Sequence, residues 1–478
     1  MLVVHHPIRI LLSAVLASFT VFADHALAAD WLGNIADGTV WSAGQVHRVI
    51  GNATVPEGST LTIQAGAIIK FNLGTSLYIG GTLNANGTSG SPVLMTSSTD
   101  DTGGDTNGDG SETSPVPGSW NKLDILSSGS ASLVWVNLRY GGDESYSSVG
   151  NLRISGGDLT FNNGSVVQSD SAGIYIASAE PTISGVNFQD NRHSAIRMNV
   201  DSQPAISTVS YSNNGVNGVF VDGGTLSLNR SWDDPEAVYL LNGDVVVPDA
   251  ITLTVGAGQI VKPKQGVDLF INGVLDVNGS LSNPVYFVAP SDDSHGGDTN
   301  NDADQSTPEI GAWNQIRISS TGSASLDWTH IAHGGDVSFS MWGNLTVDGG
   351  GLSFNNGSVQ QSDSAGIYMA SSEPVISGVA FHDNRQSAMR MNVDSQPVIS
   401  AVSYNNNGVN GVFVDGGTLS LSRSWDDPEA VYLLNADIAV PDGKTLTVGP
   451  GQVIKPKSGV DLFIDGGCHH LAQRNIPD

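Results

Sequence analysis

A long internal duplication constrains the fold of this chain more than any other feature. Residues 169–244 recur at 362–437, 193 positions later, and 64 of the 76 residues are identical. A fold that can be doubled in its middle is quasi-one-dimensional, because each repeat contacts only its neighbours. Any site inside the block is therefore present twice. This favours a repeated surface over a single buried catalytic pocket.

A shorter period runs inside the duplicated block. Residues 181–184 (Pro-Thr-Ile-Ser) recur 23 positions later as residues 204–207 (Pro-Ala-Ile-Ser). Each unit consists of short alternating apolar segments separated by Gly, Asn, Asp and Ser, which is typical of strands joined by turns. No stretch keeps a 3.6-residue apolar period, so we expect few helices. The pattern predicts an all-β coil of stacked parallel strands, with 22–23 residues per turn.

Parallel stacking gives this period a structural consequence. Neighbouring strands lie about 4.8 Å apart, so equivalent residues of successive turns sit above one another. We expect Asn191 and Asn214 to form a structural ladder at one corner of the coil, with each amide bonding along the axis. The expected core stacks are Ile183 over Ile206, Phe188 over Tyr211, and Ile176 over Met198 over Val221.

The N-terminus has the features of a secretory signal peptide at residues 1–28. Arg9 supplies the positive charge, residues 10–22 the apolar segment, and residues 26–28 (Ala-Leu-Ala) the small-residue cleavage site. The apolar run is shorter than the roughly 20 residues that a membrane span needs. We therefore expect an exported protein, extracellular or on the cell surface, with the periplasm as an alternative, and no membrane insertion.

The charge balance limits the class of partner. The formal net charge is −28, although only 14% of the residues are charged. Nucleic acid and anionic lipid are poor partners for such a surface, whereas divalent cations are good ones. The single Cys excludes an intramolecular disulfide.

A second repeated element sets the unit boundaries. It begins at Val55, Val247 and Val440, each time with the sequence Val-Pro followed by Glu-Gly or Asp, and the third copy stops in mid-turn near Gly467. We expect the gene to be truncated or frame-shifted relative to its relatives. The expected layout is a signal peptide (1–28), a first unit with an N-terminal cap (29–244), a near-duplicate second unit (245–437), a partial third unit (438–467) and a non-repeat tail (468–478).

These elements, together with the Asp- and Gly-rich loops that begin at Asp100 and Asp292, resemble bacterial right-handed parallel β-helix repeat proteins with a pectin-lyase-like fold. The resemblance covers nearly all of the mature chain and implies the right-handed β-helix fold. It leaves function open, because that fold carries polysaccharide lyases, glycoside hydrolases, adhesins and structural stalks. The set of Asn-Thr-Asp, paired-Asp and Gly-His-Gly segments that marks polygalacturonase-type enzymes is absent, since neither Asn-Thr-Asp nor Gly-His-Gly occurs in this sequence.

The two acidic loops resemble EF-hand-type calcium loops, because oxygen-bearing side chains recur at alternate positions. Each loop departs from the full pattern: Val116 takes the place of the bidentate acid in the first, and Ala303 that of Gly in the second. The alternative is a solvated acidic bulge; Trp120 and Trp313 mark the return of each loop to the coil. The candidate Ca²⁺ ligands are Asp105, Asn107 and Asp109 in the first loop, and Asp298, Asn300, Asp302, Asp304 and Glu309 in the second.

The duplicated block also predicts an outward-facing ladder. Tyr175, Arg197 and Phe220 point outward and stack on successive turns if the residue before each of them points inward. The second copy repeats the ladder as Tyr368, Arg390 and Phe413. Such a stack gains cation–π energy and offers a flat platform for sugar rings. The alternative is a ladder whose members satisfy only one another.

Candidate catalytic residues do not converge in the sequence. Asp190 with Arg192, and Arg197 with Asp201, are the carboxylate–guanidinium pairs that a lyase would need. Turn Asp and edge Arg residues are ordinary in such a fold. We therefore expect an exported structural, adhesive or glycan-binding protein with calcium in its loops. A polysaccharide lyase or glycoside hydrolase acting on an acidic polysaccharide is the alternative.

Overall fold

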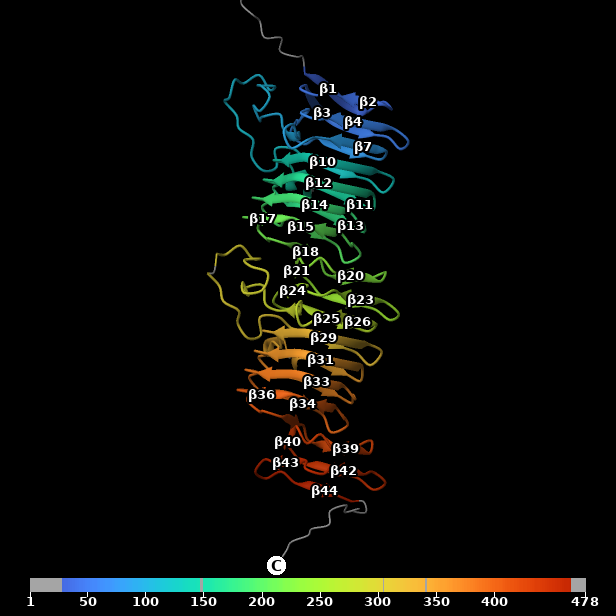
Figure 1. The fold of residues 1–478 in the computed structure, drawn as a ribbon, viewed down its shortest axis with the longest axis vertical. Coiled ribbons are helices and arrows are strands. Elements are labelled where there is room, and N and C mark those ends of the chain that lie inside the picture. Colours follow the sequence, from blue (N-terminus) through green and yellow to red (C-terminus); the bar gives the residue numbers. More distant parts are fainter. Residues whose placement is uncertain (1–27, 147–148, 304, 340–341, 466–478) are drawn as a thin grey trace, which may run out of the picture.

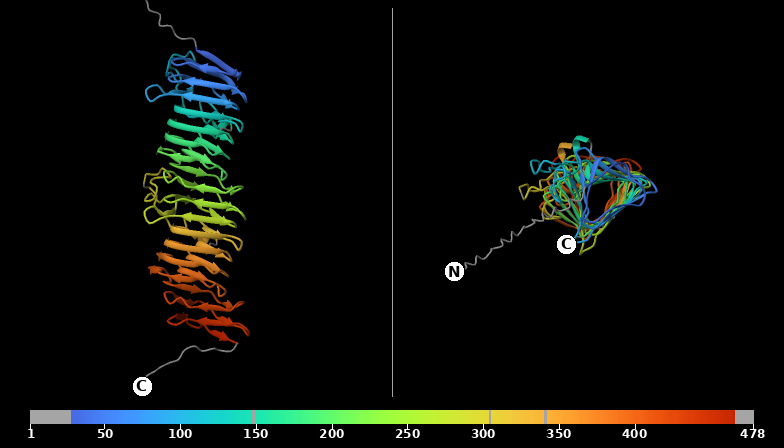
Figure 2. Two further views of the ribbon diagram at one scale, coloured as in Figure 1. Left: turned by 45° about the vertical axis from the view of Figure 1, so that its right-hand side comes forward. Right: turned by 90° about the horizontal axis from the view of Figure 1, so that it is seen from above.

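Alternating apolar residues, repeated every 22 or 23 positions, build one long column of parallel strands (Figure 1). The computed structural model describes residues 28–146, 149–303, 305–339 and 342–465. All pairings between its named strands are parallel, and its helices are the two 3₁₀ turns η1 (Glu144–Tyr146) and η2 (Val337–Phe339). The fold is the right-handed parallel β-helix that the sequence predicts. Viewed from the end, the strands stack into the sides of a single closed coil (Figure 2).

Corresponding strands recur in the two units. Long strands with a bend near their middle form two sides of each turn, and short strands form the third. The long strands are β10 (Ser130–Arg139), β12 (Asp158–Val167) and β14 (Thr182–Gln189), matched by β29 (Ser323–Ala332), β31 (Gly351–Gln360) and β33 (Val375–His382). The short strands are β11 (Gly150–Ser155), β13 (Ala172–Ala177), β15 (Ile196–Met198) and β18 (Val219–Val221), matched by β30 (Gly343–Asp348), β32 (Ala365–Ala370), β34 (Ser387–Met391) and β37 (Val412–Val414).

The core consists of the predicted stacks. The pairing register confirms Ile183 over Ile206, Phe188 over Tyr211, and Ile176 over Met198 over Val221. The rings of Phe188 and Tyr211 lie 5.8 Å apart and nearly parallel. Stacked aliphatic and aromatic columns of this kind remove apolar surface from water along the whole axis, which is the main source of stability in a chain with no disulfide.

The corner ladder of asparagines is also confirmed. Asn191 donates through Nδ2 to Oδ1 of Asn214 at 2.8 Å and to the carbonyl of Val166 at 2.9 Å. Its own Oδ1 accepts the backbone N–H of Ser169. Both asparagines are buried, so each amide supplies hydrogen bonds that water cannot supply there. These residues are structural, as expected.

The boundary between units changes the strand pattern. β21 (Val238–Leu241) pairs with β18 above it and with β24 (Ile260–Pro263) below it (Figure 1). Trp232 stacks on Tyr239 at 5.4 Å, and the Tyr239 hydroxyl donates to Asp234 at 2.8 Å. The boundary segment is therefore an ordered part of the coil. It connects the last short strand of the first unit, β18, to the first turns of the second unit.

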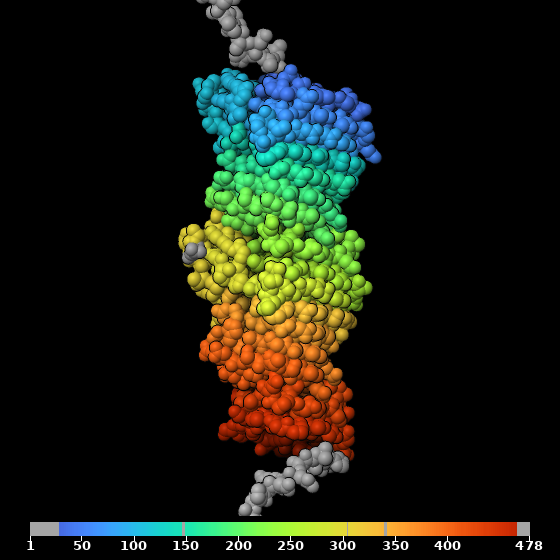
Figure 3. All heavy atoms as spheres, viewed as in Figure 1, coloured from blue at the N-terminus to red at the C-terminus, as the bar shows by residue number. Residues whose placement is uncertain are grey.

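Both acidic loops leave the column on the same side (Figures 1 and 3). The predicted return points hold: Trp120 and Trp313 are fully buried and donate through Nε1 to the carbonyls of Arg139 and Ala332, each at 2.8 Å. Residues 1–27 of the expected signal peptide (1–28) and the expected tail (468–478) lie outside the described residues. Among the described residues, no helix is long and apolar enough to cross a bilayer.

We predict that Asn191→Ala destabilises the protein, because it leaves the carbonyl of Val166 and the amide of Ser169 without their partner. Loss of a buried hydrogen-bonding group costs about 1–3 kcal/mol. Urea unfolding followed by circular dichroism measures the change. Asn187→Ala is the control, since the hydrogen bond that the Asn187 side chain accepts, from the Ser210 hydroxyl, is exposed. Equal midpoints for the two variants would contradict a structural role for the ladder.

Candidate functional site

The first ladder is the outward column formed by Tyr175, Arg197 and Phe220 on β13, β15 and β18. The pairing register places these residues directly above one another. The guanidinium carbon of Arg197 lies 5.6 Å from the centroid of Tyr175 and 5.8 Å from that of Phe220. Arg197 Nε also donates to Asp222 at 2.9 Å. The arginine is thus held between two rings and anchored by a carboxylate, with 32% of its side chain exposed.

A shallow groove of about 460 Å³ runs beside the first ladder. Its volume falls within the range of about 300–1,000 Å³ that is common for ligand sites. The Nζ atom of Lys264 lies 5.4 Å from the centroid of Phe220 and so extends the ladder by one cation. The lining residues are Arg192, His193, Ser194, Arg197, Gly215, Val216, Phe220, Asn242 and Lys264.

The groove therefore gathers three permanent cations on a chain in which Asp and Glu outnumber Lys and Arg by 47 to 19. Its aromatic and basic residues recur in the second unit, where His193 alone is replaced by another residue, Gln386. A groove of this composition is suited to an anionic ligand with a flat apolar face.

The second ladder is the column formed by Tyr368, Arg390 and Phe413 on β32, β34 and β37. Arg390 donates to Asp415 at 2.9 Å, and its guanidinium carbon lies 5.9 Å and 5.7 Å from the two ring centroids. Trp342 adds a third ring, with its centroid 4.6 Å from that guanidinium carbon. The predicted stacking geometry is thus present in both copies.

The structure does not assemble the candidate catalytic residues into one site. Asp190 sits at a corner with φ of +56°, a conformation that Asp tolerates better than most residues, and its carboxylate accepts hydrogen bonds from Gln189 and Asn213. Arg192 pairs with Asp170 at 2.9 Å. Asp201 binds Ser227, so Arg197 has Asp222 as its partner in place of Asp201. Of the four candidate residues, only Arg192 and Arg197 line the groove.

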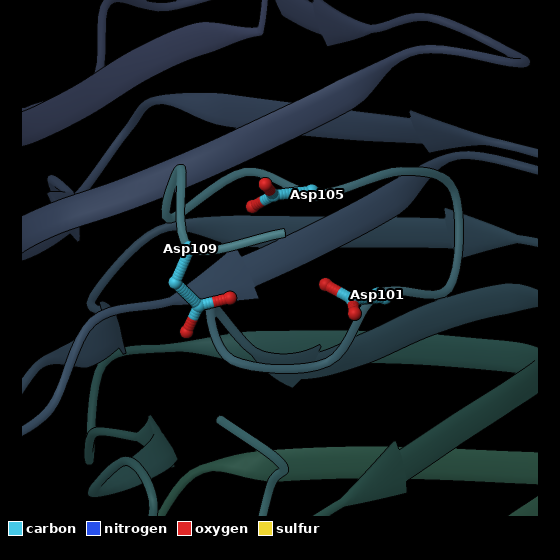
Figure 4. Close-up of side chains that lie close together, drawn as sticks. All are labelled: Asp101, Asp105 and Asp109. Atoms are coloured by element: carbon cyan, nitrogen blue, oxygen red, sulfur yellow. The ribbon is translucent and has the colours of Figure 1, made fainter. Parts of the chain in front are cut away.

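Each acidic loop curls so that three carboxylates converge. In the first loop these are Asp101, Asp105 and Asp109, each with an oxygen within 4.8 Å of the others (Figure 4). In the second loop the equivalent set is Asp293, Asp298 and Asp302. Hydrogen bonds from the amides of Gly110 and Gly108 hold the pKa of Asp105 below its usual value, so this carboxylate stays ionised in mildly acidic solution.

The converging sets differ from the predicted ligands. Asn107 and Asn300 turn their amide nitrogens towards Asp109 and Asp302, at 2.8 Å each, so they act as donors within the loop. Glu309 is exposed and outside the cluster, and Asp304 lies outside the described residues. Asp101 and Asp293 were missed. The signal for them was present, since both loops open with Asp-Asp.

A buried lysine holds the base of each loop. Lys70 donates to the carbonyl of Gly104 at 2.6 Å. Lys262, which is fully buried, donates to the carbonyl of Asp292 and the hydroxyl of Thr299, both at 2.9 Å. Burial lowers the pKa of Lys262 to about 8, although the nearby acidic side chains oppose the shift. Residues 262–264 (Lys-Pro-Lys) thus supply one loop anchor, Lys262, and one groove cation, Lys264.

The second acidic loop also contacts the end of the first unit. Asn217 donates its backbone amide to the carbonyl of Thr299 at 2.9 Å and its side-chain amide to the carbonyl of Asp298 at 3.1 Å. Asn217 follows Gly215 and Val216, which line the groove. The acidic loop therefore braces the turn that forms one edge of the groove.

We predict that Lys262→Met removes a pH dependence of stability. The unfolded pKa, about 10.4, exceeds the folded value of about 8, so the unfolded state binds more protons between these pH values and the wild type gains stability as pH rises through the window. Between pH 7 and pH 10 the wild type should gain about 1–3 kcal/mol relative to the variant. Urea unfolding at both pH values measures this. Lys264→Met is the exposed control, and parallel behaviour of all three proteins would contradict the prediction.

One comparison with known proteins bears on this architecture. Residues 33–165 match the family model described as a pectate-lyase-like β-helix domain. Comparison with curated proteins gives no match. The matched segment includes the first acidic loop and ends before Tyr175, so it supports the β-helix fold and assigns no role to either ladder.

Proposed function

We propose that this protein is exported and binds a polysaccharide or cell-surface glycan through the first ladder and its groove, with Ca²⁺ bound in the acidic loops. The observation that carries the proposal is the collection of Arg192, Arg197 and Lys264 in the groove beside Phe220, with Tyr175 stacked on Arg197, on an otherwise acidic chain. Its role is adhesive or structural, and the second unit repeats the same surface.

The chemistry of the groove suits an acidic sugar. The apolar face of a sugar ring packs against the exposed rings, while its carboxylate accepts charge-assisted hydrogen bonds from guanidinium and ammonium groups. Arg197 needs no rearrangement to take part, because Tyr175, Phe220 and Asp222 already hold it. A preorganised side chain loses less conformational entropy on binding.

Calcium has a place in this proposal as a brace for the loops. Ca²⁺ takes carboxylate and carbonyl oxygens as ligands, and three converging carboxylates in each loop supply such a set. The second loop contacts Asn217 at the groove edge, so a cation among Asp293, Asp298 and Asp302 would stiffen that edge. It would also reduce the negative charge near an anionic ligand.

A lyase or hydrolase acting on the same polysaccharide is the alternative. Cleavage needs a base or acid within hydrogen-bond reach of the reacting atoms. The acid–base candidate in the groove is His193, which bonds to Glu144 at 2.9 Å and is replaced by Gln386 in the twin unit. Binding alone requires none of this, so the binding role fits the duplicated surface better.

We predict that the mature protein retains polygalacturonate, an acidic polysaccharide, and that Arg197→Gln weakens retention roughly tenfold, because the charge-assisted hydrogen bond from the guanidinium to a sugar carboxylate, worth about 1.5 kcal/mol, is lost. Affinity electrophoresis against acidic and neutral polysaccharides, with Ca²⁺ or with a chelator, measures retention. Arg317→Gln is the control, since Arg317 forms an exposed ion pair with Asp348. Release of new unsaturated or reducing ends would favour the enzymatic alternative.

We predict two calcium sites per chain, with affinities of roughly 10⁻⁴–10⁻³ M, as in other extracellular modules. Isothermal titration calorimetry should show one site after Asp105→Asn and one after Asp298→Asn, because each change removes a charge from one cluster. Glu309→Gln, which alters an acid outside the clusters, should retain both sites. Two sites in the Asp variants, or no heat in the wild type, would contradict the calcium assignment.

A further inference from the structure

The two ladders differ at one neighbouring position, and the residue there decides whether a ligand can reach the ladder. Trp342 immediately precedes β30 in the second unit, and the residue at the same place before β11 in the first unit is Val149. Trp342 is the only tryptophan of the second unit without a counterpart in the first. Around it, Tyr368, Arg390 and Phe413 match Tyr175, Arg197 and Phe220 one for one.

Trp342 lies on the second ladder as a ring-shaped ligand would. Its ring centroid is 5.1 Å from that of Tyr368, with 23° between the planes, and 4.6 Å from the guanidinium carbon of Arg390. The contact reduces the exposure of the arginine: 19% of the Arg390 side chain is exposed, against 32% for Arg197. Among the described residues, the cation–π partner of Tyr175 in the first unit is Arg197.

We infer that the first ladder is the open ligand site and that the second is covered by the chain's own Trp342, which occupies the place of a bound sugar ring. This inference rests on the proposed glycan-binding function and adds to it the number of sites, their location and the residue that decides it. The expected ligand is a uronate sugar, whose ring takes the place of the indole over Tyr175 and whose carboxylate reaches Arg197 or Lys264.

A covering residue of this kind has a clear energetic effect. A ligand for the second ladder must first displace Trp342 from a ring stack and a cation–π contact, which together make the covered state the favoured one. An intramolecular ring also competes at a high effective concentration, because its tether holds it beside the site. The first ladder carries no such cost.

A second difference between the units lies next to the ladders. The residue paired above Tyr175 is Arg153, and the one above Tyr368 is Thr346. Arg153 is directed to Asp124, with 3.8 Å between the charged atoms, so it flanks the first ladder as a further cation. To reproduce the second ladder in the first unit, both Val149 and Arg153 must therefore be replaced.

The test exchanges the two residues. Titration calorimetry with a short galacturonate oligosaccharide should give one site per chain for the wild type, two for Trp342→Val, and at least a tenfold weaker site for Val149→Trp. Val149→Trp combined with Arg153→Thr reproduces the second unit in the first and should also weaken binding. Trp342→Phe keeps a covering ring and should retain one site.

The outcomes separate the inference from the function on which it rests. Circular dichroism and the unfolding midpoint of each variant establish that it is folded, and the Val149→Trp variants test the inference from the opposite direction if Trp342→Val does not fold. Binding by the wild type at two equal sites, or one site in both the wild type and folded Trp342→Val, overturns the inference and leaves glycan binding standing. Absence of binding in every variant overturns both.

Discussion

Register between parallel strands is the constraint on which the rest of this structure depends. Successive turns lie about 4.8 Å apart, so the neighbours of a side chain are the residues 22 or 23 positions away. The buried column of Ile176, Met198 and Val221 and the outer column beside it, with Arg197 at its centre, arise from the same pairing. A one-residue slip would exchange the two columns, turning arginine inward and isoleucine outward. The core therefore fixes the site.

Columns could be predicted from the sequence because they are periodic. The spacing of residues 181–184 and 204–207 sets the register, and the register placed Asn191 on Asn214 and Arg197 between two rings. The loops have no such period. A pattern of ligands at alternate positions assumes that the side-chain oxygens of the loop all point towards one bound cation. In this structure Asn107 and Asn300 instead donate hydrogen bonds to neighbouring carboxylates. The loops close through their first residues, Asp101 and Asp293, because a buried lysine fastens each base.

Contacts that cross the unit boundary were the other part that the sequence did not predict. Lys264 reaches the first ladder from the position directly after β24 in the next unit, because β21 pairs with both β18 and β24. Likewise Asn217 meets the acidic loop 81 positions further on. Such contacts depend on how the chain turns at residues 232–241. That segment is repeated too seldom for a period to reveal its path. Within the first unit, Arg197 pairs with Asp222, directly after β18, in place of the predicted Asp201.

Duplication makes two copies of a surface, but it does not keep them equal. The core residues of the copies are held alike by packing, since a changed volume in a stacked column affects the turns on both sides. Outer positions have no such restraint, and a single side chain there changes what the surface can bind. Trp342 contacts the aromatic and cationic groups of its ladder from within the chain, and Arg390 there is less exposed than Arg197 in the first ladder, 19% against 32%. The contacts of Trp342 in the second ladder therefore indicate the shape and chemistry of the ligand that the first ladder would bind.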